Sequence, residues 1–144
     1  MSSLEVGDPL AHRALQALVR AESTVRRRVA ADLEREGISA AGFSVLVLLT
    51  TAGGHLELRT VRRRLGWSKA NATEVTLTLE QHGMITRRKL ARDRRSLVIE
   101  LTAAGAEQVE GLFPDHSRRV TRAFSSLDEH EKRSLADICR KLAA

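Results

Sequence analysis

Apolar residues recur at helical spacing in the first part of the chain, between residues that start or end helices. Asp8 followed by Pro9 is typical of a helix start. The apolar positions after them follow one helical face to about Glu36, just before Gly37: Leu15, Leu18, Val25, Val29 and Leu33. A helix of this length is long for a small globular unit, so we expect part of it to pack on a partner.

A second helix is predicted over residues 40–51, because Ser39 can cap its start and Gly53-Gly54 can end it. Its apolar run, residues 45–49, would also fit a buried strand, and periodicity alone does not decide between the two. The start signal before this segment and the stop signal after it favour the helix.

Two short helices joined by a tight turn are predicted next, after an extended piece at residues 55–57. The first helix covers residues 58–65 and carries arginines on its outer surface. The turn Gly66-Trp67-Ser68 then leads into a helix that ends at His82, with Ser68 as its cap. Two short helices around a turn that contains glycine are typical of a helix-turn-helix unit.

The second helix of this unit should turn Ala72, Val75 and Leu79 inward. Its other side is mostly small or polar and could lie close to base edges in a DNA major groove. That side carries Lys69, Ala70, Asn71, Thr73, Glu74, Leu77 and Thr78. An ordinary solvated face is the alternative, but the basic segments on either side favour DNA recognition.

Two β-patterned pieces, residues 84–89 and 96–101, follow Gly83 and enclose a basic link. Six positive residues there oppose a single acid, Asp93: Arg87, Arg88, Lys89, Arg92, Arg94 and Arg95. A helix followed by a basic hairpin is the plan of a winged-helix DNA reader. The predicted fold class is therefore mainly α with a small β wing: a winged helix-turn-helix domain with long N- and C-terminal helices.

The C-terminal part is predicted to be helical again. Thr102 can cap a helix that runs to Phe113, where Pro114 should bend or briefly break it. The helical pattern resumes at residues 120–127. Asp128 and Glu131 then resemble a capping box for a last helix, which carries Leu135, Ile138 and Leu142.

Charge is concentrated in the same stretch as the helix-turn-helix and the hairpin. Residues 59–95 hold eleven Lys/Arg and three acids, whereas the rest of the chain holds thirteen Lys/Arg and fifteen acids. A positive excess confined to about a quarter of the chain is the footprint of a polyanion site. Solubility alone would not require that concentration.

Other classes of protein find little support in the sequence. No stretch approaches the roughly 20 apolar residues that cross a bilayer, and the N-terminus does not resemble a signal peptide. One cysteine, Cys139, allows neither an internal disulfide nor a zinc site, which favours a reducing cytoplasm. An enzyme is disfavoured, since the chain shows no glycine-rich phosphate loop, nucleophile elbow or clustered acid–base set. The five histidines are dispersed, so we expect no metal and no cofactor.

From residue 65 to residue 105 the chain resembles the MarR family of winged-helix transcriptional regulators. The family pattern has a Leu-Gly-x-Ser turn, a Leu-Glu-x-x-Gly-hydrophobic-x-x-Arg step, Asp-Arg-Arg and Leu-Thr-x-x-Gly. These elements stand here in that order, at Leu65–Ser68, Leu79–Arg87, Asp93–Arg95 and Leu101–Gly105. With the length of the chain and its long terminal helices, the resemblance covers nearly the whole sequence.

This resemblance implies a homodimer that binds double-stranded DNA at a pseudo-palindromic operator, most often as a repressor. Residues 1–36 and 102–144 would form a helical dimerisation region, and residues 38–101 the DNA-binding region. Many relatives release DNA when they bind small aromatic acids or other lipophilic compounds. By resemblance, such a ligand would lie near Phe43, Val47 and the start of the helix that follows Thr102.

Arginines of the hairpin and of the preceding helix are the candidate phosphate contacts, because guanidinium groups bind phosphate oxygens in bidentate fashion. Arg94 is placed at the tip of the wing, and Asp93 is expected to brace the wing rather than to face DNA. The full set of candidate backbone contacts is Arg62, Arg63, Arg87, Arg88, Arg92, Arg94 and Arg95.

Candidate base contacts lie on the helix after Ser68. Asn71 can pair with adenine, Lys69 with guanine, and Thr73 with a thymine methyl group. Ala70, Glu74 and Thr78 complete the candidate set. Glu74 departs from the basic or neutral residue common there in the family, and could accept from a cytosine amino group or pair with an arginine.

The sequence leaves two alternatives open. The protein could be a weakly specific architectural DNA binder, or a redox-responsive regulator that uses Cys139. A thiol packed among Leu135, Ile138 and Leu142 is favoured over a redox switch. Trp67 is interpreted as the anchor of its turn rather than as a ligand or base contact.

Overall fold

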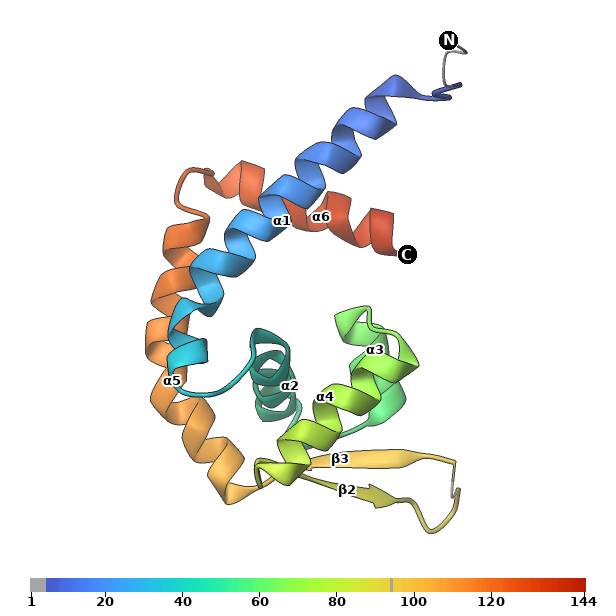
Figure 1. The fold of residues 1–144 in the computed structure, drawn as a ribbon, viewed down its shortest axis with the longest axis vertical. Coiled ribbons are helices and arrows are strands. Elements are labelled where there is room, and N and C mark those ends of the chain that lie inside the picture. The colour runs from blue at the N-terminus through green and yellow to red at the C-terminus, as the bar shows by residue number, and fades with distance from the viewer. Residues whose placement is uncertain (1–4, 94) are drawn as a thin grey trace.

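The computed structural model describes residues 5–93 and 95–144, which form helices and a small sheet at one edge of the fold (Figure 1). The fold class expected from the sequence is confirmed: the chain is mainly helical with a small β wing. The helices are α1 (Pro9–Arg35), α2 (Ala40–Thr51), α3 (Leu58–Leu65), α4 (Lys69–Gln81), α5 (Ala103–Ala123) and α6 (Glu129–Ala143). The strands are β1 (His55–Glu57), β2 (Ile85–Lys89) and β3 (Leu97–Leu101).

Side-chain caps fix the start of most helices where the sequence places them. The carboxylate of Asp8 accepts from the Leu10 amide of α1 at 3.0 Å, and the hydroxyl of Ser39 accepts from the Gly42 amide of α2 at 2.9 Å. Asp128 and Glu131 form a complete capping box on α6. The run at residues 45–49 lies inside α2, so its alternative interpretation as a strand was wrong.

The three strands form one antiparallel sheet in the order β1-β3-β2. Strands β2 and β3 are the expected hairpin, paired from Ile85 opposite Leu101 to Lys89 opposite Leu97. The piece at residues 55–57, expected only to be extended, pairs with β3 as a third strand. This strand anchors the wing to the segment between α2 and α3.

The core lies where α2 meets α4, α5 and the sheet. Phe43, Leu46 and Leu49 of α2 are at most 1% exposed, and Ile85 and Ile99 of the wing strands are equally buried. The wing therefore contributes apolar side chains to the same core as the helices, which fixes its orientation relative to α4.

Helix α5 corrects one expectation. It runs without a break from Ala103 to Ala123, with Pro114 inside it, so the expected helix end near Phe113 was wrong. Proline removes one backbone donor and leaves the carbonyl of Glu110 without its usual partner. Both Pro114 and Glu110 are exposed, so water can hydrogen-bond that carbonyl and the packing of the remaining turns keeps the helix continuous.

The start of α5 is joined closely to the end of α4. The Thr102 hydroxyl donates to the Gly83 carbonyl at 2.6 Å and accepts from the Gly105 amide at 3.1 Å. A Cβ atom on Gly105 would stand 2.2 Å from the Met84 carbonyl oxygen, so only glycine fits there without a shift. We call these four residues the α4–α5 joint.

Helix α6 and the first half of α1 expose apolar side chains. The first half of α1 extends away from the compact part of the chain, and α6 overlaps α1 in the view of Figure 1. The exposed side chains include Leu10, Leu15, Leu18, Val19, Leu135, Ile138 and Leu142. Within the described residues, no helix is both long enough and apolar enough to cross a membrane.

Candidate nucleic-acid interface

The turn between α3 and α4 is built as a helix-turn-helix requires. Gly66 ends α3 with φ of 69°, a left-handed conformation that favours glycine. The Ser68 hydroxyl then accepts from the Asn71 amide at 3.1 Å and starts α4. Trp67 is half-buried against the core, in the position of a turn anchor.

Helix α4 presents its polar side to solvent. Ala72, Thr76 and Leu79 are buried, and Val75 is half-buried. The candidate base contacts are exposed apart from Thr73, which is half-buried: Lys69, Ala70, Asn71, Glu74 and Thr78. The sequence did not single out Thr76, whose buried hydroxyl donates to the Ala72 carbonyl at 2.7 Å.

Asp93 organises the turn of the wing through hydrogen bonds. Its carboxylate accepts from the Arg95 amide at 3.0 Å and from the Ser96 hydroxyl at 3.1 Å. These bonds involve the backbone of Arg95 rather than a guanidinium group, so the Arg95 side chain is free to face a ligand. Arg94, assigned to the tip of the wing, lies outside the described residues.

Four cationic residues from three elements meet around a hollow of about 380 Å³ beside the wing. They are Arg59 and Arg62 of α3, Lys69 at the start of α4, and Arg95 of the wing, and we call them the basic cluster. Nε of Arg62 is buried with no hydrogen-bond partner among the described residues. Arg59 is paired with Glu57 at 2.7 Å.

The sequence suggested Arg62, Lys69 and Arg95 as separate contacts, and the fold brings them together. Arg59 belongs to the basic stretch of the sequence but is not among the contacts expected from it. The position of β1 beside the wing places Arg59 in the cluster, and periodicity of the chain could not reveal that pairing.

The other candidate arginines have distinct surroundings. Arg63 and Arg92 are exposed. Nε of Arg88 lies 3.6 Å from Glu100 of the neighbouring strand. Arg87 is half-buried, and its Nε has no partner among the described residues, while its backbone amide donates to the Glu80 carboxylate at 3.2 Å. Glu80 therefore links α4 directly to β2.

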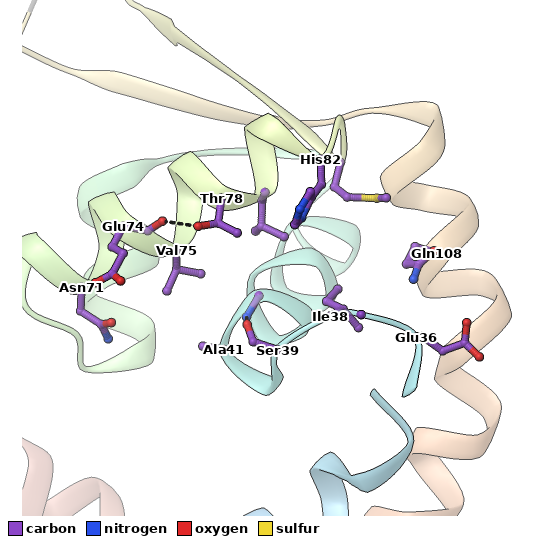
Figure 2. Close-up of a pocket in the computed structure, with 14 residues that line it drawn as sticks. Glu36, Ile38, Ser39, Ala41, Asn71, Glu74, Val75, Thr78, His82 and Gln108 are labelled. Carbon is purple, nitrogen blue, oxygen red and sulfur yellow. Dashed lines mark hydrogen bonds between the residues drawn. The ribbon is translucent and has the colours of Figure 1, made fainter. Parts of the chain in front are cut away.

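The two residues expected to contact a ligand, Phe43 and Val47, are largely covered by other side chains. Phe43 is 1% exposed, and Val47 is half-buried. His116 of α5 packs edge-on against Phe43, with ring centroids 4.9 Å apart, and burial lowers the pKa of His116 below its ordinary value. A larger hollow, of about 730 Å³, lies along α4, close to the start of α2 (Figure 2).

Cys139 is exposed in the single chain, so the expected packed thiol was wrong for this subunit. Together with Phe124 and Leu135 it lines a hollow between α5 and α6. The helical spacing of its apolar neighbours was identified correctly, but those neighbours are themselves exposed.

Comparison with known proteins agrees with this geometry. The sequence model of the MarR family matches residues 38–97. An uncharacterized HTH-type transcriptional regulator of Bacillus subtilis (strain 168), YkoM, is 32% identical over 126 residues, which cover 88% of this chain and 81% of that protein. The transcriptional repressor MprA of Escherichia coli (strain K12) is 33% identical over 111 residues, which cover 76% of this chain and 63% of MprA.

A solved structure supports the fold independently. A MarR family transcriptional regulator from Streptomyces coelicolor, in complex with DNA, superposes with a TM-score of 0.84. The match covers 99% of this chain and 91% of the other at 20% sequence identity. Because YkoM is similar along most of both chains and the family model matches the helix-turn-helix and wing, this chain belongs to the MarR family of transcriptional regulators.

Proposed function

We propose that this chain binds double-stranded DNA as a homodimer and represses transcription from a pseudo-palindromic operator. The observation that carries the proposal is the basic cluster, which stands beside the exposed face of α4. The guanidinium group of Arg62, whose Nε has no partner among the described residues, lies next to the candidate recognition helix α4. In this position it could bind a phosphate oxygen beside a major groove. MprA, similar to this chain over much of its length, is itself a transcriptional repressor.

The division into two regions supports a dimer. We assign residues 1–36 and 102–144 to dimerisation, and residues 38–101 to DNA binding, and call the second region the reader. The exposed apolar side chains of α1 and α6 fall in the first region. A two-fold dimer would place its two copies of α4 about 34 Å apart, in successive major grooves.

Within the reader, affinity and discrimination come from different residues. Helix α4 is nearly neutral, since Lys69 is offset by Glu74, so the arginines of α3 and the wing would supply most phosphate contacts. Asn71, Lys69 and Thr73 would read bases beside Ala70, Glu74 and Thr78. The protein would act in the cytoplasm. A small lipophilic or aromatic ligand would release it from DNA there, as the family resemblance implies.

Selection of bound DNA from a random pool, followed by footprinting at several salt concentrations, tests this function. We expect an inverted repeat with half-sites about one helical turn apart, and affinity that falls steeply with salt. A weakly specific architectural protein would bind random and selected DNA alike. Failure to enrich an inverted repeat would exclude specific dimeric regulation.

A pair of substitutions separates the two groups of contacts. Arg62→Ala should weaken binding to operator and to random DNA by a similar factor, because a phosphate contact carries no sequence information. Asn71→Ala should weaken operator binding by about tenfold and leave binding to random DNA nearly unchanged. If Arg62→Ala affects only the operator, this arginine reads sequence and the assignment is wrong.

A further inference from the structure

The 730 Å³ hollow along α4 combines apolar walls with polar side chains at its ends. Its apolar surface comes from Ile38 before α2, from Val75 and Leu79 of α4, and from Met84 at the start of the wing. Gln108 of α5 stands at one end and Asn71 at the other (Figure 2). This volume is within the range of about 300–1,000 Å³ that is usual for small-molecule sites.

Apart from the imidazole of His82, the ionisable side chains that line the hollow are carboxylates. Glu36 and Glu74 line it, and none of its described lining residues is lysine or arginine. No described cationic group lies within ion-pair distance of either carboxylate. Glu36 follows the last turn of α1, whereas Glu74 lies on α4, so the fold places one acid near each end of the hollow, Glu36 beside Gln108 and Glu74 beside Asn71 (Figure 2).

The contrast with the rest of the reader makes this arrangement informative. Between residues 59 and 95 positive residues outnumber acids by eleven to three, yet the hollow beside α4 presents two unpaired carboxylates, one of them from this stretch. An acidic ligand would meet two like charges there, and these would oppose its binding. A ligand with a positive charge and an apolar body would match both the carboxylates and the apolar walls.

We propose that this hollow binds a small lipophilic cation, such as an amine or a quaternary onium compound with an aromatic or aliphatic body. This proposal specifies the ligand class for the ligand-induced release that is part of the proposed function. The regulatory role of the site rests on that function. Neither Phe43 nor Val47 lines it, and its charge selects against the acids that the family resemblance suggests.

Occupation of the hollow would act directly on the DNA-reading face. Asn71, Glu74 and Thr78 line the hollow, and the same three side chains belong to the proposed base contacts. A bound cation would occupy space beside them and engage Glu74. Cation and operator DNA therefore compete, and an increase in cation concentration releases DNA.

The test uses two ions of matched size and shape but opposite charge, tetraphenylphosphonium and tetraphenylborate. Binding of each to the full chain is measured by isothermal titration calorimetry without DNA. We expect one tetraphenylphosphonium per chain, with affinity lowered about tenfold in the double variant Glu36→Gln, Glu74→Gln. Glu34→Gln is the matched control, because it removes an equal charge near Glu36 from a residue that does not line the hollow.

A second variant tests the location without a change of charge. Thr78→Phe adds bulk to an exposed lining residue and should weaken tetraphenylphosphonium binding while both carboxylates remain. The proposal is overturned if the double variant binds the cation as tightly as the original chain, or if tetraphenylborate competes for the same site with equal affinity. Because these titrations contain no DNA, their outcome is independent of whether an operator is found.

Discussion

The reader and the terminal helices differ in how they bury apolar side chains. In the reader, Phe43, Leu46 and Ile99 are at most 1% exposed, in a core shared by helices and sheet. In α6 no residue is buried, and Ile138 and Leu142 are 63% and 70% exposed. The apolar side chains of the reader are therefore buried within the single chain, in a core to which Leu33 of α1 and Val109 of α5 also contribute. By contrast, α6 and the first half of α1 gain little from folding unless another surface covers them.

The largest effect is expected from truncation in the core of the reader. Leu46→Ala should lower the free energy of unfolding by about 2–5 kcal/mol, because it removes a fully buried side chain and leaves a cavity. The same truncation in α6, Leu142→Ala, is the matched control and should have a much smaller effect in dilute protein. Urea unfolding followed by circular dichroism measures both, and equal losses would contradict the comparison.

A charge on the exposed face of α6 should separate subunits without unfolding the reader. Ile138→Asp is expected to weaken dimerisation by about a hundredfold, since a carboxylate would have to be buried at the interface. Sedimentation equilibrium measures the association, and circular dichroism checks that the reader remains folded. Leu77→Asp provides the control, because Leu77 is exposed on α4 rather than on the terminal helices. An unchanged association for Ile138→Asp would remove α6 from the interface.

A smaller effect is expected from the ion pair that ties α1 to α5. Arg119 of α5 pairs with Asp32 of α1, and both side chains are little more than a quarter exposed. Asp32→Asn should cost about 1 kcal/mol or less of stability, because solvent screens a pair of this exposure. The more exposed pair Arg26–Glu22 is the control, and Glu22→Gln should be close to neutral in the same unfolding experiment.

The last prediction concerns pH. Burial lowers the pKa of His116, so its contribution to stability is present above the ordinary histidine pKa and is lost as the pH falls through the lower folded value. His116→Phe should therefore flatten the decline of stability below about pH 6.5. His130→Gln, at an exposed position of α6, should leave that decline in place. A decline that survives His116→Phe unchanged would assign it to other groups.

The sequence was sufficient to predict most helices and strands, but not how they pack and pair with one another. Caps such as Ser39, Ser68 and Thr102 act locally, so helix starts could be read from neighbouring residues. The unbroken α5 could not, because packing along the helix outweighs the local effect of Pro114. The wing hairpin was predictable from its pattern, whereas pairing of β1 with β3 joins segments more than 40 residues apart.

The candidate site shows the same limit. Exposure of Asn71 and Glu74 followed from the period of α4, and the positive charge of the wing was visible in the sequence. The basic cluster and the acidic hollow were not visible, because each collects residues from separate segments. Glu74 is unusual on a DNA-reading helix from the sequence alone, but its position relative to Glu36 depends on where α1 ends relative to α4.

The α4–α5 joint also bears on how such proteins can be recombined. A chimera cut after Leu101 would take Gly83 and Met84 from one parent and their contacts, Thr102 and Gly105, from the other. Any side chain at position 105 would collide with the Met84 carbonyl oxygen and tilt the transplanted helix. The exchangeable unit therefore extends one helical turn into α5, and the crossover belongs after residue 105.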